Sequence, residues 1–158
     1  MRWLQNLLEW TAGLLLFGLL VVGFLQVVSR YTGIFFIPWT EEAARLLFVW
    51  LVWVGAAAGL IRGGHIRFEF VVDRLPAKMR RLTEMFVHAG VGIFLFIVIR
   101  YGYVVAQSQA ASTFLTFGLS IKYTYLSAVA GSALMLVGLA GGIWTLLRTA
   151  TGESDGRP

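Results

Sequence analysis

Four long apolar runs separated by shorter polar segments set the pattern of this sequence, and they cover residues 11–29, 41–61, 86–106 and 123–147. A helix of about 20 apolar residues is long enough to cross the hydrocarbon core of a bilayer. The pattern therefore predicts an all-α integral membrane protein with four transmembrane helices. We expect a single membrane domain over residues 1–148, followed by a polar tail at 149–158.

The first run has an alternative interpretation as a cleaved signal peptide. The run is too long for the apolar part of such a peptide, and no small-residue cleavage site follows it before Arg30-Tyr31. We therefore expect an uncleaved membrane anchor. A short amphipathic approach containing Glu9 and Trp10 would precede it.

The second run begins with charged residues. Thr40 is of the type that caps helix N-termini, and carboxylates in the first turn complement the positive end of the helix dipole. Glu41 and Arg45 are spaced as an i,i+4 pair. At 3.6 residues per turn, six residues of this helix form one stripe: Glu41, Arg45, Phe48, Val52, Gly55 and Gly59. The stripe ends in a Gly-xxx-Gly pair, which lets another backbone approach closely.

Small residues also follow one face of the fourth run. Ser127, Gly131, Gly138 and Gly142 recur at four- and seven-residue spacings, which predicts a close-packing face.

The segment between the second and third runs is basic. If the segment is helical, several of its basic residues lie on one face and apolar residues lie on the neighbouring face. This pattern favours an amphipathic helix on the membrane surface, interrupted at Leu75-Pro76. A basic cytoplasmic loop without a specific partner explains the pattern equally well. The basic residues are Arg62, Arg67, Arg74, Lys78, Arg80 and Arg81.

The distribution of Lys and Arg predicts the topology. The side that holds both termini and the basic segment carries most of these residues, and the positive-inside rule places that side in the cytoplasm. The beginning of the second run and the Ser/Thr-rich turn at 107–120 then face outward.

Composition excludes several classes of function. Hydrophobic residues make up 58% of the chain and charged residues 13%, so the chain lacks the polar surface of a soluble domain. The net charge of +5 does not indicate nucleic acid, because the basic residues cluster between apolar runs where headgroups and topology account for them. The absence of cysteine excludes disulfides, thiolate metal sites and a cysteine nucleophile.

Candidate chemistry is sparse. Proton relays and ion-coupled carriers need ionisable groups inside the membrane, and no Asp, Glu or His lies in the middle of a predicted span. His65 and His88 are predicted on the same side, so they cannot be paired haem ligands at two depths. Matched inverted halves, Ser-His-Asp arrangements and phosphate loops do not stand out either. We expect neither an enzyme nor a complete pump, and no cofactor bound by this chain.

Four motifs carry a family resemblance: S-R-Y at 29–31, W-T-E-E-A-A-R-L-L-F-V-W at 39–50, G-A at 55–56 and R-G-G-H-I-R-F-E-F at 62–70. With them, essentially the whole chain resembles the small membrane subunit (DctQ-like, or Q subunit) of tripartite ATP-independent periplasmic transporters. The W-x-E-E-x-x-R-x-x-x-x-W pattern is the most specific part. Two departures are Glu69, where the family often has Asp, and Ala130-Gly131, where a Pro is expected before the Gly; the second leaves the shape of the fourth helix open.

The resemblance implies a division of labour in the bacterial inner membrane. In such systems a soluble periplasmic binding protein (DctP-like) captures an organic anion of the carboxylate or sulfonate class and delivers it to a membrane complex. A large DctM-like subunit holds the substrate and sodium sites and moves as an elevator, so the coupling sodium ion is expected there. The small subunit would be a scaffold that enlarges the stationary part of the complex in the lipid bilayer.

Two surfaces are candidates for partner contacts. The interface with the large subunit would use Trp39, Glu41, Glu42, Arg45, Phe48, Val52, Gly55 and Gly59, and docking of the binding protein would use Trp39, Ser112, Thr113, Thr116 and Ser120. The alternatives are capping and pairing within this chain for the charged residues, and lipid contact for Trp50 and Trp53.

A self-contained, homo-oligomeric small transporter or channel is the alternative function. Four-span multidrug exporters need a membrane-embedded acid in the first span, whereas Glu9 precedes the apolar core here.

Overall fold

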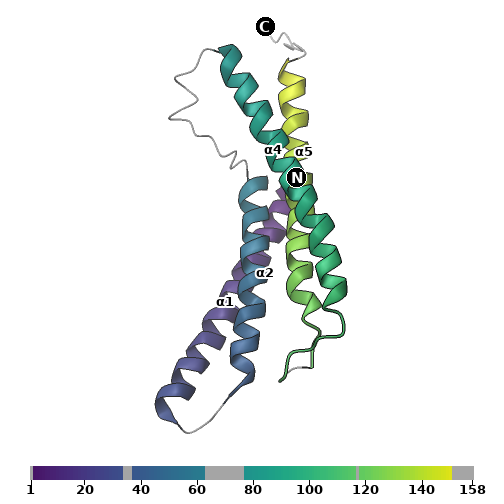
Figure 1. The fold of residues 1–158 in the computed structure, drawn as a ribbon. Coiled ribbons are helices and arrows are strands. Elements are labelled where there is room, and N and C mark those ends of the chain that lie inside the picture. The colour runs from purple at the N-terminus through teal and green to yellow at the C-terminus, as the bar shows by residue number, and fades with distance from the viewer. Residues whose placement is uncertain (1, 34–36, 63–76, 117, 151–158) are drawn as a thin grey trace.

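The computed structural model describes residues 2–33, 37–62, 77–116 and 118–150. The described residues form four α-helices, α1 (Arg2–Thr32), α2 (Trp39–Ile61), α4 (Ala77–Ser108) and α5 (Lys122–Ala150) (Figure 1). Each contains a segment long and apolar enough to cross a membrane. The prediction of an all-α chain with four such helices is confirmed.

The helices extend beyond the predicted spans. Helix α1 begins at Arg2, so Glu9 and Trp10 belong to the same helix as the first apolar run and not to a separate approach. Helix α4 begins at Ala77, so residues 77–84 of the basic segment continue directly into the third run. Arg67, Arg74 and the Leu75-Pro76 interruption lie outside the described residues, and the predicted surface helix stays a prediction.

The predicted cap of α2 is wrong. The helix starts at Trp39, and Pro38 occupies the N-cap position without a side-chain cap. Proline has a fixed φ that suits the first turn of a helix, which explains the earlier start. Thr40 is buried, and its hydroxyl donates a hydrogen bond to the carbonyl oxygen of Ile37 at 2.7 Å.

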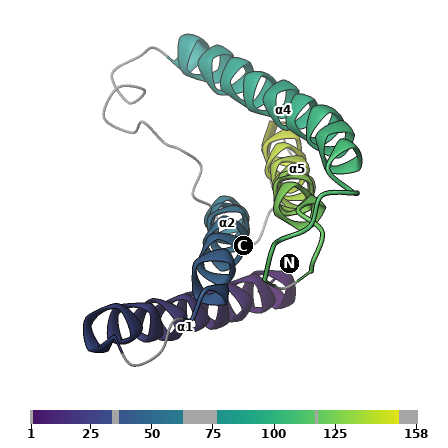
Figure 2. The same ribbon diagram turned by 60° about the horizontal axis from the view of Figure 1, so that its bottom comes forward.

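The helices pack in the order α1, α2, α5, α4. Extensive contacts join α1 to α2, α2 to α5 and α5 to α4. Figure 2 shows α1 and α4 on opposite sides of the central pair α2 and α5. The arrangement is therefore an open series of helices and not a closed four-helix bundle.

The buried core lies where the first half of α1 crosses the second half of α2. Leu8 packs there with Val54 and two alanines of α2, Ala57 and Ala58. Small side chains in α2 let the α1 backbone approach closely. Partly buried residues surround this cluster: Leu4, Ala12, Leu15, Trp50, Ile61, Leu134 and Met135.

Glycines of α5 form the contact with α2. A Cβ atom at Gly131 would lie 2.7 Å from the Cβ of Trp53 and 3.0 Å from its carbonyl oxygen. A Cβ at Gly138 would lie 2.7 Å from Cγ1 of Ile61. Ser127 on the same helix is fully buried. The predicted close-packing face of the fourth run is confirmed for these residues, whereas the surroundings of Gly142 are not described.

Helix α5 is unbroken, and two tryptophans of α2 pack against other parts of the chain. Helix α5 runs unbroken through Ala130-Gly131. Trp50 packs against the core cluster and Trp53 against Gly131. Both tryptophans thus take part in packing within the chain, so lipid contact alone does not account for them.

Candidate partner surfaces on the second helix and the outer hairpin

The connection between α4 and α5 contains a small hairpin. Thr113 and Ser120 form an isolated antiparallel bridge. The amide of Phe114 donates to the carbonyl oxygen of Leu119 at 2.8 Å, and that of Ile121 donates to Ser112 at 2.8 Å. Gly118 has a φ of +65°, which favours glycine in this turn. We call residues 112–116 and 118–121 the outer hairpin, because the charge distribution of the sequence predicts that this segment faces outward.

Ser120 connects the outer hairpin to the turn that follows α4 and to the first residue of α5. Its hydroxyl lies 2.9 Å from the carbonyl oxygen of Ala110 and 3.3 Å from that of Gln109, to which it can donate. The same oxygen accepts a hydrogen bond from the amide of Lys122 at 3.3 Å. Ser120 therefore stabilises the hairpin in this chain.

The carboxylate of Glu42 holds the tip of the outer hairpin. Oε1 accepts a hydrogen bond from the amide of Leu115 at 3.0 Å, and Oε2 accepts one from the amide of Thr116 at 3.1 Å. Hydrogen bonds to an ionised acceptor are stronger than neutral ones. Glu42 thus connects the first turn of α2 to a loop more than 70 residues away in the sequence.

Adjacent residues of the hairpin differ sharply in exposure. Phe114 is 8% exposed, whereas Leu115 is 99% exposed. Phe114 precedes the turn, whereas Leu115 lies in the turn at the tip, which accounts for the difference. Among its described residues, the outer hairpin therefore has a buried aromatic anchor, Phe114, and an almost fully exposed apolar side chain, Leu115.

The stripe predicted on α2 is open. We call Glu41, Arg45, Phe48, Val52, Gly55 and Gly59 the α2 stripe. Phe48 is 55% and Val52 is 49% exposed, and nothing lies within 4 Å of a Cβ built at Gly55 or Gly59. No ion pair joins Glu41 to Arg45 in the described part of the chain. The α2 stripe thus faces away from α1 and α5.

The structure brings the predicted docking residues into one region. Trp39, at the start of α2, lies one turn before Glu42 and is 36% exposed. Through Glu42 this turn is joined to the outer hairpin, where Thr113 and Thr116 are exposed and Ser112 is partly exposed. The sequence predicts both segments on the outward side, but it contains no signal for the Glu42 contact or for the exposure of Leu115.

Comparison with known proteins settles the family. The family model described as the DctQ component of tripartite ATP-independent periplasmic (TRAP) transporters matches residues 19–149. This chain belongs to the DctQ family. With four helices long and apolar enough to cross a membrane, the DctQ chain is a multi-pass component of the bacterial inner membrane. It is a subunit of a transporter and not an enzyme.

Similar proteins include small permease subunits and a larger permease. The chain is 31% identical over 117 residues to the sialic acid TRAP transporter small permease protein SiaQ of Vibrio cholerae, covering 74% of this chain and 68% of SiaQ. It is 33% identical over 102 residues to the C4-dicarboxylate small permease protein DctQ of Rhodobacter capsulatus, covering 61% of this chain and 44% of that protein.

A third match is to the sialic acid TRAP transporter permease protein SiaT of Haemophilus influenzae, at 31% identity over 105 residues. It covers 65% of this chain but 17% of SiaT. The DctQ chain thus spans about a sixth of the length of that relative.

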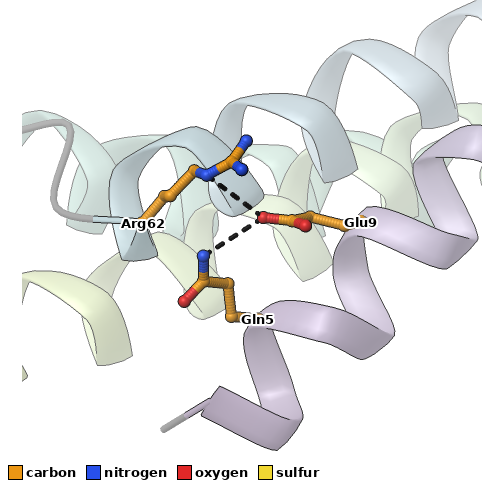
Figure 3. A network of polar contacts seen from close by, with 3 residues as sticks. All are labelled: Gln5, Glu9 and Arg62. Atoms are coloured by element: carbon orange, nitrogen blue, oxygen red, sulfur yellow. Dashed lines mark hydrogen bonds and ion pairs between the residues drawn. The ribbon is translucent and has the colours of Figure 1, made fainter.

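At the other end of α2, a polar contact links this helix to α1. Oε1 of Glu9 accepts a hydrogen bond from Nε2 of Gln5 at 3.1 Å and lies 3.5 Å from Nε of Arg62 (Figure 3). The side chains of Arg62 and Glu9 are 71% and 37% exposed, so solvent screens the ion pair. Arg62, expected as part of the basic membrane-surface segment, is therefore also a contact between helices of the DctQ chain.

Proposed function

We propose that this chain is the small scaffold subunit of a sodium-coupled, binding-protein-dependent secondary transporter for organic anions of the carboxylate or sulfonate class. It would pack against the large, elevator-type membrane subunit through the α2 stripe. The observation that carries this proposal is that no described residue packs against the Gly-xxx-Gly pair of the α2 stripe. Close approach of a second backbone is what such a pair permits in a membrane.

The helix arrangement supports a scaffold. In the series α1, α2, α5, α4 the outer helices are packed mainly on one neighbour each. Much of their apolar surface is exposed and suits lipid or a second membrane protein. Every Asp and Glu of the four helices lies in the first eight residues of its helix. Acidic groups at membrane depth, which would be expected around a coupling ion, are therefore better sought on another chain.

The relatives support the proposed partners and substrate class. A sequence like this one occurs within SiaT, a much longer permease protein, which favours packing against a larger membrane subunit. The relatives are described as carriers of sialic acid and C4-dicarboxylates, and both are carboxylates. We infer that substrate and sodium bind in a DctM-like large subunit, and that a DctP-like periplasmic protein delivers the substrate.

We further propose that both termini and the basic segment lie in the cytoplasm, as the charge distribution indicates. The outer hairpin and the start of α2 would then face the periplasm. This orientation gives the binding protein access to Trp39 and to the exposed threonines of the hairpin.

One substitution tests the α2 stripe. Gly55→Leu places a bulky side chain in the Gly-xxx-Gly pair, so we expect a severalfold loss of large subunit co-purified with this chain. Gly90→Leu is the matched control, because a Cβ at Gly90 of α4 also meets open space. An unchanged yield with Gly55→Leu would reject the α2 stripe as the interface.

Reconstitution tests the function as a whole. Sodium-driven uptake of a carboxylate would be measured in liposomes with this chain alone, the large subunit alone, and both together, each with and without the binding protein. We expect uptake only when all three proteins are present. Uptake by this chain alone would contradict the scaffold and favour a self-contained transporter.

A further inference from the structure

The outer hairpin is held at two places. Backbone hydrogen bonds between its two strands close the base, at Ser112–Ile121 and Phe114–Leu119. The amides of Leu115 and Thr116, nearer the tip, instead donate to the carboxylate of Glu42. The base would survive the loss of Glu42, but the position of the tip relative to α2 depends on it.

The two consecutive amides of Leu115 and Thr116 are each bonded to a separate acceptor oxygen of one side chain. A carboxylate offers two oxygens in one plane, and each of them receives one amide in this structure. In glutamine one of these two oxygens is replaced by an NH2 group, which is a donor, so in the same geometry glutamine would accept from only one of the two amides. Glu41, the neighbouring acid, is exposed and has no hydrogen bond to the outer hairpin.

We propose that Glu42 is a positioning residue that fixes the outer hairpin on α2 so that Leu115 is presented to the soluble substrate-binding protein. This inference rests on the proposed function, because it assumes the periplasmic orientation of the hairpin. It assigns to Glu42 a contact inside the chain in place of the contact with the large subunit that its motif suggested. It also adds Leu115, which the sequence analysis did not include, to the docking surface.

The surroundings of Leu115 favour a protein partner with water access. Leu115 is 99% exposed, and Thr113 and Thr116 beside it are exposed as well. An exposed apolar side chain next to exposed polar ones resembles the centre and the rim of a protein contact. Leu119, which is 44% exposed, adds apolar surface to the same hairpin. Glu42 prevents this anchor from folding back onto the helices.

The position of Glu42 also relates the two proposed interfaces. Glu42 lies next to Glu41 and three residues before Arg45, which both belong to the α2 stripe. The same turn of α2 therefore holds the hairpin on one side and begins the stripe on the other. The binding protein would dock on a platform whose position is set by the helix that packs against the large subunit.

Hydrogen–deuterium exchange in the reconstituted membrane complex tests the positioning directly. The readout is the exchange rate in a peptide that contains Leu115 and Thr116. We expect at least tenfold faster exchange of these two amides in Glu42→Ala, an intermediate increase in Glu42→Gln, and no change in the control Glu41→Gln. Unchanged protection in Glu42→Ala would overturn the positioning role.

Uptake titrated with the substrate-loaded binding protein tests the docking role. We expect Glu42→Ala and Leu115→Ser each to raise the half-saturating concentration of binding protein at least fivefold with little change in the maximal rate. Leu115→Met keeps an apolar side chain and should retain most of the affinity, whereas the control Glu9→Gln, outside both proposed interfaces, should behave like the unmodified complex. An unchanged half-saturating concentration in Leu115→Ser would overturn the docking role while leaving the scaffold intact.

Co-purification separates this inference from the proposed function. If Leu115→Ser releases the large subunit, the outer hairpin contacts that subunit and the inference is wrong. If the unmodified chain does not co-purify with the large subunit at all, the proposed function itself fails.

Discussion

Replacing Gly131 by alanine should loosen the contact between α2 and α5. The added Cβ would lie 2.7 Å from the Cβ of Trp53 and 3.0 Å from its carbonyl oxygen. Carbon atoms in van der Waals contact are about 3.5 Å apart or more, so the helices would have to separate by roughly 0.8 Å at this point. The obstacle includes backbone atoms of α2, which cannot rotate away.

The expected loss of stability follows from two opposing effects. Overpacking of a well-filled contact costs about 1–3 kcal/mol. Alanine in place of glycine in a helix returns about 0.5–1 kcal/mol, because glycine has more freedom in the unfolded chain. Since the backbone contact leaves little room to relax, we expect Gly131→Ala to lower the free energy of unfolding by about 1–2 kcal/mol. This corresponds to roughly a tenfold change in the folding equilibrium.

Reversible unfolding in detergent, followed by helical circular dichroism and by tryptophan fluorescence, would measure this change. Gly90→Ala is the matched control, because nothing lies within 4 Å of a Cβ at Gly90. That variant should be as stable as the unmodified chain or slightly more stable. If Gly131→Ala and Gly90→Ala unfold with the same free energy, the close approach of α5 to α2 is not as described and the reasoning fails.

Two further predictions concern polar contacts of the helix ends. Thr40→Val keeps the shape of a buried side chain but removes the hydroxyl that donates to Ile37, so we expect a loss of about 1 kcal/mol in the same unfolding assay; a variant of unchanged stability would show that this bond adds nothing. Glu9→Gln removes the ion pair with Arg62, and because Arg62 is largely exposed and Glu9 is about one third exposed, we expect a change below about 1 kcal/mol that disappears in high salt. A larger, salt-independent change would mean that the pair is shielded from water.

The sequence predicts the helices well because the bilayer imposes their length. Apolar runs of the required length correspond to α1, α2, α4 and α5. Helix ends are less well predicted. Polar residues such as those around Glu9 and Lys78 do not stop a helix, so α1 and α4 extend well beyond the apolar runs.

The sequence does not show which neighbour each glycine face packs against. The pairs at 55 and 59 in α2 and the glycines at 131 and 138 in α5 have the same pattern of small residues, and both were expected to pack closely. Of these two pairs, only the α5 glycines meet another helix within the part of the chain that the structure describes. A periodicity identifies a face that permits close approach, but the neighbour that fills it depends on the arrangement of all four helices.

The contact of Glu42 with the outer hairpin was also beyond sequence reasoning. Local rules assign a carboxylate in the first turn to the helix dipole or to an i,i+4 partner. Its actual partners, the amides of Leu115 and Thr116, belong to a loop positioned by α4 and α5. Backbone amides carry no residue-type signal, so no pattern in the sequence marks them as partners.

The bond between Glu42 and the outer hairpin has a mechanical consequence. The hairpin is covalently continuous with α4 and α5, while Glu42 belongs to α2, so the outer ends of α2 and α5 are linked through this bond as well as through the Gly131 contact. A movement that separates these two helices must break both links together. We therefore expect α2, α5 and the hairpin to move as one rigid unit.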